Sequence, residues 1–371
     1  MQTPDLSALN TMVLSAAFLL SLLFGALVQR THFCTMGAVS DAVNMGDWTR
    51  MRQWGLAIGV AMAGFALLVY AGLIDPAKTL HGGKRWLWLS ATVGGLLFGL
   101  GMVLASGCGS KSLVRVGSGN LKSLVVLLVM GLTGFATMKG ITAVLRVSTV
   151  DQVGVDFAVT ANLPHLAASA LGLSPTLATL WLGLGSGVAL IAWALRGEDF
   201  LRAENLLAGL GVGGIVVAMW WVSGSLGHVV EHPQTLDDVY LATNSGRAEA
   251  MSFVAPVAYT LDWVMFYSDA SKVLTLGIVS VFGVIAGSAL MALWTRTFRW
   301  EGFGGTEDVA NHLVGAALMG VGGVTAMGCT IGQGLTGLST LGLNSLVAFG
   351  AIVAGSVAGF KYQMWRLERM D

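Results

Sequence analysis

The sequence has few charged residues and no excess of either sign. Only 11% of its 371 residues are Asp, Glu, Lys or Arg, and 20 basic residues balance 20 acidic ones. Soluble globular domains contain about 25% charged residues, and a soluble protein of this composition could not cover its surface with polar groups. A soluble protein is therefore excluded. The chain also has no excess of Lys and Arg over Asp and Glu, which a nucleic-acid binder would show, so no nucleic-acid partner is expected.

Cysteine is also scarce, and segments typical of disorder are missing. The chain has three cysteines, an odd number without a Cys-x-x-Cys pair, which argues against a disulfide framework. No block of like charge or polar low-complexity run predicts a disordered tail. Residues 1–10 contain no Lys or Arg ahead of the first apolar stretch, so we expect a membrane span there and no cleavable signal peptide.

Apolar residues and glycine are abundant instead. Apolar residues make up 55% of the chain, and its 51 glycines are roughly twice the average share. A membrane-spanning helix needs about 20 mainly apolar residues. We therefore predict an all-α integral membrane protein. About nine transmembrane helices are expected, at 12–29, 53–74, 91–107, 123–145, 176–195, 204–223, 273–294, 309–328 and 343–361. A further stretch, 252–267, contains Pro256 and Asp262 and is predicted to be re-entrant or interfacial.

The distribution of Lys and Arg between the predicted loops indicates an orientation. With the N-terminus outside, thirteen of the 20 basic residues face the cytoplasm, as the positive-inside rule requires. Lys78, Lys84 and Arg85 share one external loop and oppose this assignment. On balance we expect an external N-terminus and a cytoplasmic C-terminus.

One segment of the chain is repeated. Residues 99–108 and 320–329 are identical at six of ten positions, and both copies end in cysteine. The predicted spans run in opposite directions at the two copies, which indicates an inverted repeat of the kind that places transport sites between two halves. We expect one membrane transport domain over residues 1–371. It comprises a first half at 12–145, a linker span at 176–195 and a second half at 204–361.

The three cysteines occupy similar positions in the sequence. Cys34, Cys108 and Cys329 each lie just beyond an apolar stretch and precede small or hydroxyl-bearing residues. A broken helix at membrane depth is tolerated where it lines a cavity, and its free amides favour an anion. A thiol is a weak donor with a soft sulfur atom. The three residues are therefore candidates for a path taken by a soft, sulfur-containing anion. The alternative is that they are ordinary buried cysteines.

Two metal-based interpretations are weaker. Cysteine and methionine together can select Cu(I), but the 17 methionines include no pair three or four residues apart. His228, Glu231 and His232 fit the His-x-x-Glu-His pattern of some zinc peptidases. Because Pro233 follows at once and no separate catalytic domain surrounds the motif, we interpret it as a chance match. No cofactor or metal site is expected.

Several charged residues allow two interpretations each. Asp308 and His312 form either a proton-handling pair or simple interfacial groups. Arg30, Lys111 and Arg115 lie near cysteine segments in the sequence. They can attract an anion, and they are equally well explained as cytoplasmic anchors of the spans.

The three cysteine segments resemble the YeeE/YedE family of bacterial membrane proteins for sulfur-compound transport. The resemblance rests on the segments at 25–37, 99–110 and 320–332, and with the number of spans it covers nearly the whole chain. It implies nine spanning helices plus re-entrant ones, in a multi-pass inner (plasma) membrane protein with a periplasmic N-terminus. Thiosulfate would be imported, passed along Cys34, Cys108 and Cys329 by thiol hydrogen bonds without covalent attachment.

The same resemblance implies a transporter and not an enzyme. A TusA-like or rhodanese-type sulfur carrier is implied as a small cytoplasmic partner. Some family members are linked to selenium instead. A selenium-compound or other soft-ion transporter, and a membrane enzyme that uses persulfide chemistry, therefore remain the alternatives.

Overall fold

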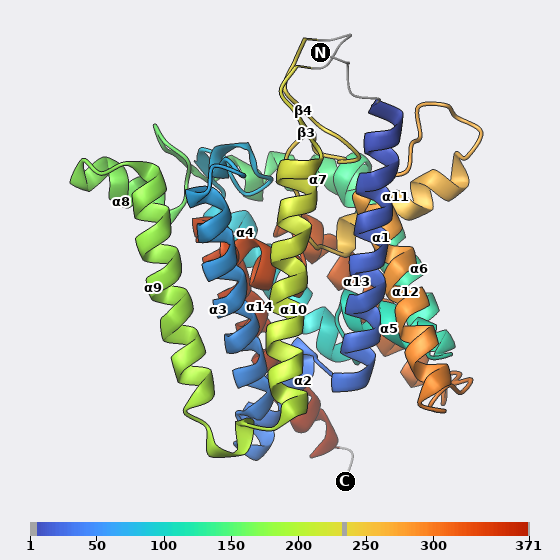
Figure 1. Cartoon of the computed structure of the whole chain (residues 1–371). Coiled ribbons are helices and arrows are strands. Elements are labelled where there is room, and N and C mark those ends of the chain that lie inside the picture. Colours follow the sequence, from blue (N-terminus) through green and yellow to red (C-terminus); the bar gives the residue numbers. More distant parts are fainter. Residues whose placement is uncertain (1–5, 232–235, 370–371) are drawn as a thin grey trace.

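The structure is a computed structural model that describes residues 6–231 and 236–369. It is a bundle of helices whose long members run between two polar faces (Figure 1). Helix α1 begins at the upper face of that view, and α14 ends at the lower face. The names upper face and lower face are used in this sense below.

The helices fall into two groups of six with three helices between them. The first group is α1 (Leu6–Thr31), α2 (Thr35–Ser40, continued by η1 at Asp41–Met45), α3 (Thr49–Tyr70), α4 (Trp88–Leu104), α5 (Gly109–Gly117) and α6 (Leu121–Lys139). Between the groups lie α7 (Ile141–Ser148), α8 (Leu163–Leu171) and α9 (Pro175–Leu195). The second group is α10 (Ala203–Trp221, continued by η5 at Val222–Leu226), α11 (Val254–Met265), α12 (Leu276–Trp294), α13 (Thr306–Thr325), η6 (Gly332–Gly337) and α14 (Leu343–Leu367).

The few remaining elements are short. Two antiparallel pairs of strands are described, β1 (Arg85–Trp86) with β2 (Val155–Asp156) and β3 (His228–Val229) with β4 (Val239–Tyr240). Single helical turns are η2 (Pro76–Lys78), η3 (Val150–Gln152) and η4 (Glu198–Phe200). The described part of the chain is therefore all-α apart from these two short strand pairs.

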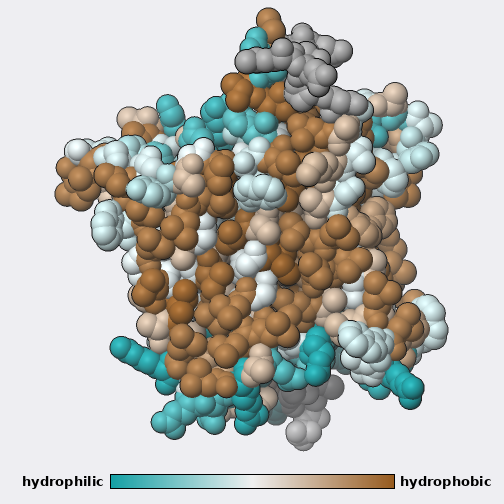
Figure 2. Space-filling model, viewed as in Figure 1, coloured by the Kyte–Doolittle hydropathy of each residue, from teal (hydrophilic) through white to brown (hydrophobic). Residues whose placement is uncertain are grey.

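The surface of the bundle carries the band expected of a membrane protein. An apolar belt lies between polar upper and lower ends (Figure 2). Within the described residues, eight helical segments are long and apolar enough to cross a bilayer. The predicted span at 309–328 lies on α13, which is not among the eight because polar residues such as Glu307 and His312 occupy its first turns. The predicted number of nine spans therefore stays a prediction.

Helix α11 covers the tenth apolar stretch. With 12 residues it is about 18 Å long, much less than the roughly 30 Å of a bilayer core. It lies in the upper half of the bundle and packs against α6 and α12. This short helix is where a re-entrant or interfacial segment was expected.

Glycine allows the long helices to touch backbone to backbone. A Cβ atom added at Gly99 of α4 would overlap the carbonyl of Ile352 in α14, and one at Gly287 of α12 would overlap that of Leu22 in α1. Small residues at such contacts are a general feature of membrane helix pairs, because association there depends on close packing. The high glycine content is thus explained by the helix interfaces.

The pairing of helices is similar in the two groups. Helix α4 packs against α14 and α13, while α13 packs against α6. Likewise α1 packs against α12, and α10 against α3. Exchanging α1 with α10, α3 with α12, α4 with α13 and α6 with α14 converts one set of contacts into the other. This is the pattern that an inverted repeat predicts, although the repeat itself stays a prediction. Helix α9, the expected linker, packs mainly on α3 at one edge (Figure 1).

Candidate functional site: three cysteines at helix breaks

Each cysteine follows a helix break with the same backbone conformation. Two residues before each cysteine, a residue other than glycine has a positive φ angle in the left-handed region, which L-residues adopt at a cost. The three residues are His32 (φ 53°), Ser106 (φ 56°) and Met327 (φ 60°). They come directly after or close behind the ends of α1, α4 and α13.

The breaks after α4 and α13 also share their hydrogen bonds. The amide of Gly107 donates to the carbonyl of Met102 over 2.9 Å, and the amide of Gly328 donates to that of Gly323 over 2.8 Å. This six-to-one bond is the one that defines the Schellman motif at helix ends. The cysteine next along the chain then starts a new helix, because its carbonyl accepts the first helical bond. These bonds are Ala38 N to Cys34 O, Ser112 N to Cys108 O and Gln333 N to Cys329 O, at 3.0, 2.9 and 2.8 Å.

The three cysteines, far apart in the sequence, converge in the folded chain. The Cys34 thiol lies against the Cys108 thiol, and the Cys329 thiol lies near that of Cys108. Cys108 Sγ lies 3.2 Å from Ser110 Oγ, and Cys329 Sγ accepts the Gly332 amide over 3.4 Å. All three cysteines are free thiols, and all are buried. The structure therefore brings the three candidate path residues close together, and their role in a path stays a prediction.

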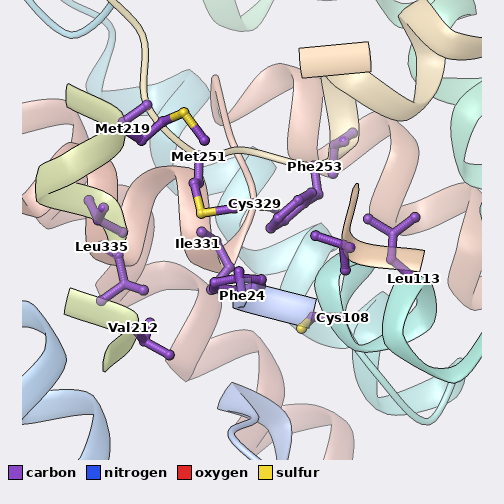
Figure 3. Packing of buried hydrophobic residues seen from close by; sticks show 14 of the residues in the cluster. Phe24, Cys108, Leu113, Val212, Met219, Met251, Phe253, Cys329, Ile331 and Leu335 are labelled. Carbon is purple, nitrogen blue, oxygen red and sulfur yellow. The ribbon is translucent and has the colours of Figure 1, made fainter. Parts of the chain in front are cut away.

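Aromatic side chains surround this cluster. Phe24 of α1 and Phe253, the residue before α11, pack with their ring centroids 5.6 Å apart. Both are fully buried and lie close to Cys108 and Cys329 (Figure 3). Among the described residues, packed aromatic side chains therefore occupy the centre of the bundle beside Cys108 and Cys329.

Two hydroxyl groups beside the cysteines are buried. Thr35 follows Cys34, and Thr330 follows Cys329, and both residues are at most 3% exposed. The Thr35 Oγ1 atom makes no hydrogen bond with any described residue, whereas the Thr330 hydroxyl lies against the Cys108 thiol. A buried hydroxyl without a partner costs about 1–3 kcal/mol. Thr330 is a neighbour of the Cys108 thiol, so donors in addition to the thiols are available at the cluster.

A cavity of about 250 Å³ opens toward the upper face and reaches the third break. Met327 and Gly328, just before Cys329, form part of its wall. Its polar lining includes Glu249, Arg146 and Tyr259. The Glu249 carboxylate accepts the Ser245 amide over 2.9 Å. Burial raises the pKa of Glu249 above the usual value for a glutamate. We call this space the upper cavity.

A second cavity, of about 180 Å³, opens toward the lower face. Cys34 and Ser106 form part of its wall, together with Arg50, Lys111 and Arg115. None of the described residues that line it is acidic. A neighbouring cavity of about 240 Å³ shares Lys111 and Arg115 with it. We call the 180 Å³ space the lower cavity. The cysteine cluster thus lies between two cavities of different charge.

Comparison with known proteins decides the family. The family model described as sulphur transport matches residues 30–358, which include all three cysteine segments. The chain belongs to the YeeE/YedE sulphur transport family. As a member of this family it is a multi-pass membrane protein for the transport of sulfur compounds.

Individual relatives are distant, and two of them are similar to this chain over most of their length. The thiosulfate transporter TsuA of Escherichia coli (strain K12) is 26% identical over 329 residues, which are 84% of each chain. The thiosulfate transporter TsuA of Spirochaeta thermophila is 27% identical over 338 residues, 89% of this chain and 93% of its own. The probable transporter YedE of Escherichia coli (strain K12) is 33% identical over 116 residues, 31% of this chain and 27% of its own.

The structure separates the charged residues that had two interpretations. Lys111 and Arg115 line the lower cavity. Arg30 does not line either cavity and is paired with Glu204 at 3.1 Å. His312 Nδ1 lies 2.9 Å from the Asp308 carboxylate, which pairs with Lys122 at 2.7 Å, and these residues also lie outside both cavities.

The zinc-peptidase pattern has no counterpart in the described structure. His228 is hydrogen-bonded to Asp238 and stacks on Tyr240, while His232 lies outside the described residues. No group of three or more metal-ligating side chains occurs within 6–231 and 236–369.

Three residues near the site were missed in the sequence. Arg50 lies sixteen positions after Cys34 and reaches the lower cavity only because the chain reverses between α2 and α3. Glu249 lies in a long connection without a motif. Phe253 had an indirect signal, because it lies at the start of the stretch 252–267 that was expected to be re-entrant or interfacial. Helix α11 does begin there, at Val254, with Phe253 at the place before it.

Proposed function

We propose that this protein imports thiosulfate, or a closely related sulfur-containing anion, across a bacterial inner membrane. The upper face is then periplasmic and the lower face cytoplasmic. The observation that carries the proposal is the convergence of three free thiols at three helix breaks, between one cavity on each side. Membership of a sulphur transport family and two relatives named thiosulfate transporters support it.

The two cavities and the thiols define an order for the path. The anion enters the upper cavity, passes Cys329 first, then Cys108, and reaches Cys34 at the wall of the lower cavity. Each thiol donates a hydrogen bond to the anion and keeps its proton, so no covalent bond forms or breaks. Because side chains fill the centre, each step needs a local displacement of groups such as Phe24 and Phe253.

The repeat gives this path its symmetry. In the proposal, residues 12–145 and 204–361 form the two inverted halves of a single domain, and 176–195 links them. Breaks at membrane depth in corresponding positions are a common way to build a transport site between inverted halves. A TusA-like or rhodanese-type protein would take over the imported sulfur on the cytoplasmic side.

Replacing single cysteines tests the proposal. Cys108→Ala or Cys329→Ala is expected to abolish uptake of radiolabelled thiosulfate into cells while leaving the amount of protein in the membrane unchanged. Ser356→Ala is the matched control. Ser356 is a fully buried small side chain whose hydroxyl bonds only within α14, to Ile352 O. Normal uptake in both cysteine variants would contradict the thiol path.

The alternatives give different results. Competition by selenium oxyanions or Cu(I) stronger than by thiosulfate would indicate another soft-ion cargo. A stable increase in intact mass by one sulfur atom after exposure to thiosulfate would indicate persulfide chemistry at a cysteine, as in an enzyme.

A further inference from the structure

The lower cavity collects positive charge without a compensating carboxylate in its lining. Lys111 and Arg115 lie four residues apart on α5 and therefore on one face of that helix. Arg50 reaches the same space from the first turn of α3. The volume of about 180 Å³ exceeds several-fold the roughly 30 Å³ that one water takes up in the liquid. The cavity is therefore large enough for a small oxyanion.

The three cations differ in what they already bind. Arg50 is paired with Asp41 at 3.3 Å, and Arg115 Nη1 donates to the carbonyl of Ser106 over 2.7 Å. The Lys111 ammonium makes no hydrogen bond or ion pair with any residue of the described ranges, and the side chain is partly buried. An ammonium group that lies among like charges without a protein acceptor attracts an anion into the same space.

The local backbone is arranged to let these cations face the cavity. A Cβ atom at Gly37 of α2 would lie 2.5 Å from Nη1 of Arg50, so glycine there leaves room for the guanidinium. The stem of Lys111 and the guanidinium of Arg115 pack over Gly107 in the second break. The cations are therefore positioned by the same breaks that position Cys34 and Cys108.

The neighbouring carboxylate is already engaged. Glu301, which lines the adjoining cavity, accepts from Asn120 Nδ2 at 2.6 Å and pairs with Arg299 at 2.7 Å. It is therefore not free to neutralise Lys111.

We propose that the lower cavity is a binding site for a divalent oxyanion, with Lys111 as its main ligand. This inference rests on the proposed function, because the anion is taken to be the imported one, which reaches the lower cavity after it leaves Cys34. Ammonium and guanidinium groups recognise charge and oxygen atoms, not soft sulfur. The site therefore takes sulfate as well as thiosulfate, and discrimination between the two belongs to the thiols.

Calorimetric titration of the purified full-length protein in non-ionic detergent tests the site. Sodium thiosulfate and sodium sulfate are the titrants, at low ionic strength. The unaltered protein is expected to bind both with similar Kd. Lys111→Gln should weaken both by about tenfold or more, because a charge-assisted bond is lost. Lys111→Arg, which keeps the charge, should retain binding.

Lys122→Gln is the matched control. It also removes a lysine charge on the lower side, but Lys122 is paired with Asp308 and does not line the lower cavity. Lys122→Gln should bind thiosulfate and sulfate with the same Kd as the unaltered protein. A measurement that needs no variant is the salt dependence, because sulfate binding should weaken as NaCl rises from about 20 to about 200 mM.

Three results would overturn the site: unchanged binding in Lys111→Gln, binding of thiosulfate without sulfate, or salt-insensitive binding. The experiment distinguishes failure of the anion site from failure of the proposed thiol path. If Cys329→Ala keeps normal uptake while binding still depends on Lys111, the thiol path is wrong and the anion site stands. If Cys329→Ala loses uptake but keeps sulfate binding at the Lys111 site, both stand.

Discussion

The upper and lower cavities lie on either side of the same cysteine cluster and differ in their charged groups. The upper cavity holds the Glu249 carboxyl together with Arg146, whose charge is balanced by Asp151 at 3.1 Å. The lower cavity holds three cations and no described acidic side chain. The breaks next to the two cavities nevertheless share a backbone conformation, so similar scaffolds can carry different chemistry. A dianion meets little net attraction at the upper cavity and strong attraction at the lower one.

Removing the hydroxyl groups beside the cysteines has the largest effect among the following changes. Thr35→Val and Thr330→Val keep the side-chain shape but remove a donor. We expect uptake of thiosulfate to fall by up to about tenfold in both variants. The free energy of unfolding should rise by about 1 kcal/mol in Thr35→Val, because this hydroxyl has no partner among the described residues, and should not rise in Thr330→Val, whose hydroxyl lies against the Cys108 thiol. Thiosulfate uptake and thermal unfolding in detergent measure the two effects.

The losses of uptake in Thr35→Val and Thr330→Val compare the break at Cys34 with the break at Cys329. Equal losses of uptake would show that the anion uses both breaks alike. Thr→Ser at either position restores the hydroxyl and should restore uptake. Unchanged uptake in both valine variants would show that these hydroxyl groups do not contribute to thiosulfate uptake.

Neutralising the upper cavity has a smaller, pH-dependent effect. Burial raises the pKa of Glu249, so the group is protonated and neutral below a pH that exceeds its usual value, and it is a charged carboxylate above it. The charged form repels a dianion. Uptake should therefore rise severalfold as the pH falls through this pKa.

In Glu249→Gln the pH dependence should be lost, with uptake at high pH raised toward its low-pH value. Initial rates of thiosulfate uptake across a pH series measure this. Asp156→Asn is a suitable control, because Asp156 is exposed on β2 and does not line the upper cavity. The same pH profile in Glu249→Gln and the unaltered protein would show that the carboxyl does not face the entering anion.

The smallest effect tests whether the second and third breaks are equivalent. Ser106→Gly and Met327→Gly each relieve a left-handed residue that costs about 1–2 kcal/mol, and the greater freedom of glycine in the unfolded chain offsets part of the gain. We expect both variants to be more stable by at most about 1 kcal/mol, measured as thermal unfolding. Destabilisation in one variant alone would show that its side chain contributes packing that the other lacks.

The sequence predicted the fold class and the helix breaks at the cysteines for reasons that can be stated. Long apolar runs require membrane helices whatever their neighbours, and glycine with small or hydroxyl-bearing residues around each cysteine at the end of such a run indicates a break. The count of spans was less certain because Glu307, Asp308 and His312 make the first turns of α13 polar.

The linings of the cavities could not be predicted, because they depend on contacts distant in the sequence. Arg30 lies nearer to Cys34 in the sequence than Arg50 does. However, α1 ends so that Arg30 meets Glu204, whereas the reversal after α2 brings Arg50 to the cavity. Glu249 and Phe253 lie in a connection whose course is set by its packing on the helices.

The glycine contacts between the long helices limit how the protein can move. At Gly99 the backbone of α4 touches that of α14, and at Gly287 the backbone of α12 touches that of α1. If either pair slid by one turn, a side chain would have to occupy the space that only glycine fits. We therefore expect the long helices to form a fixed frame, with conformational change confined to the short helices and loops at the breaks.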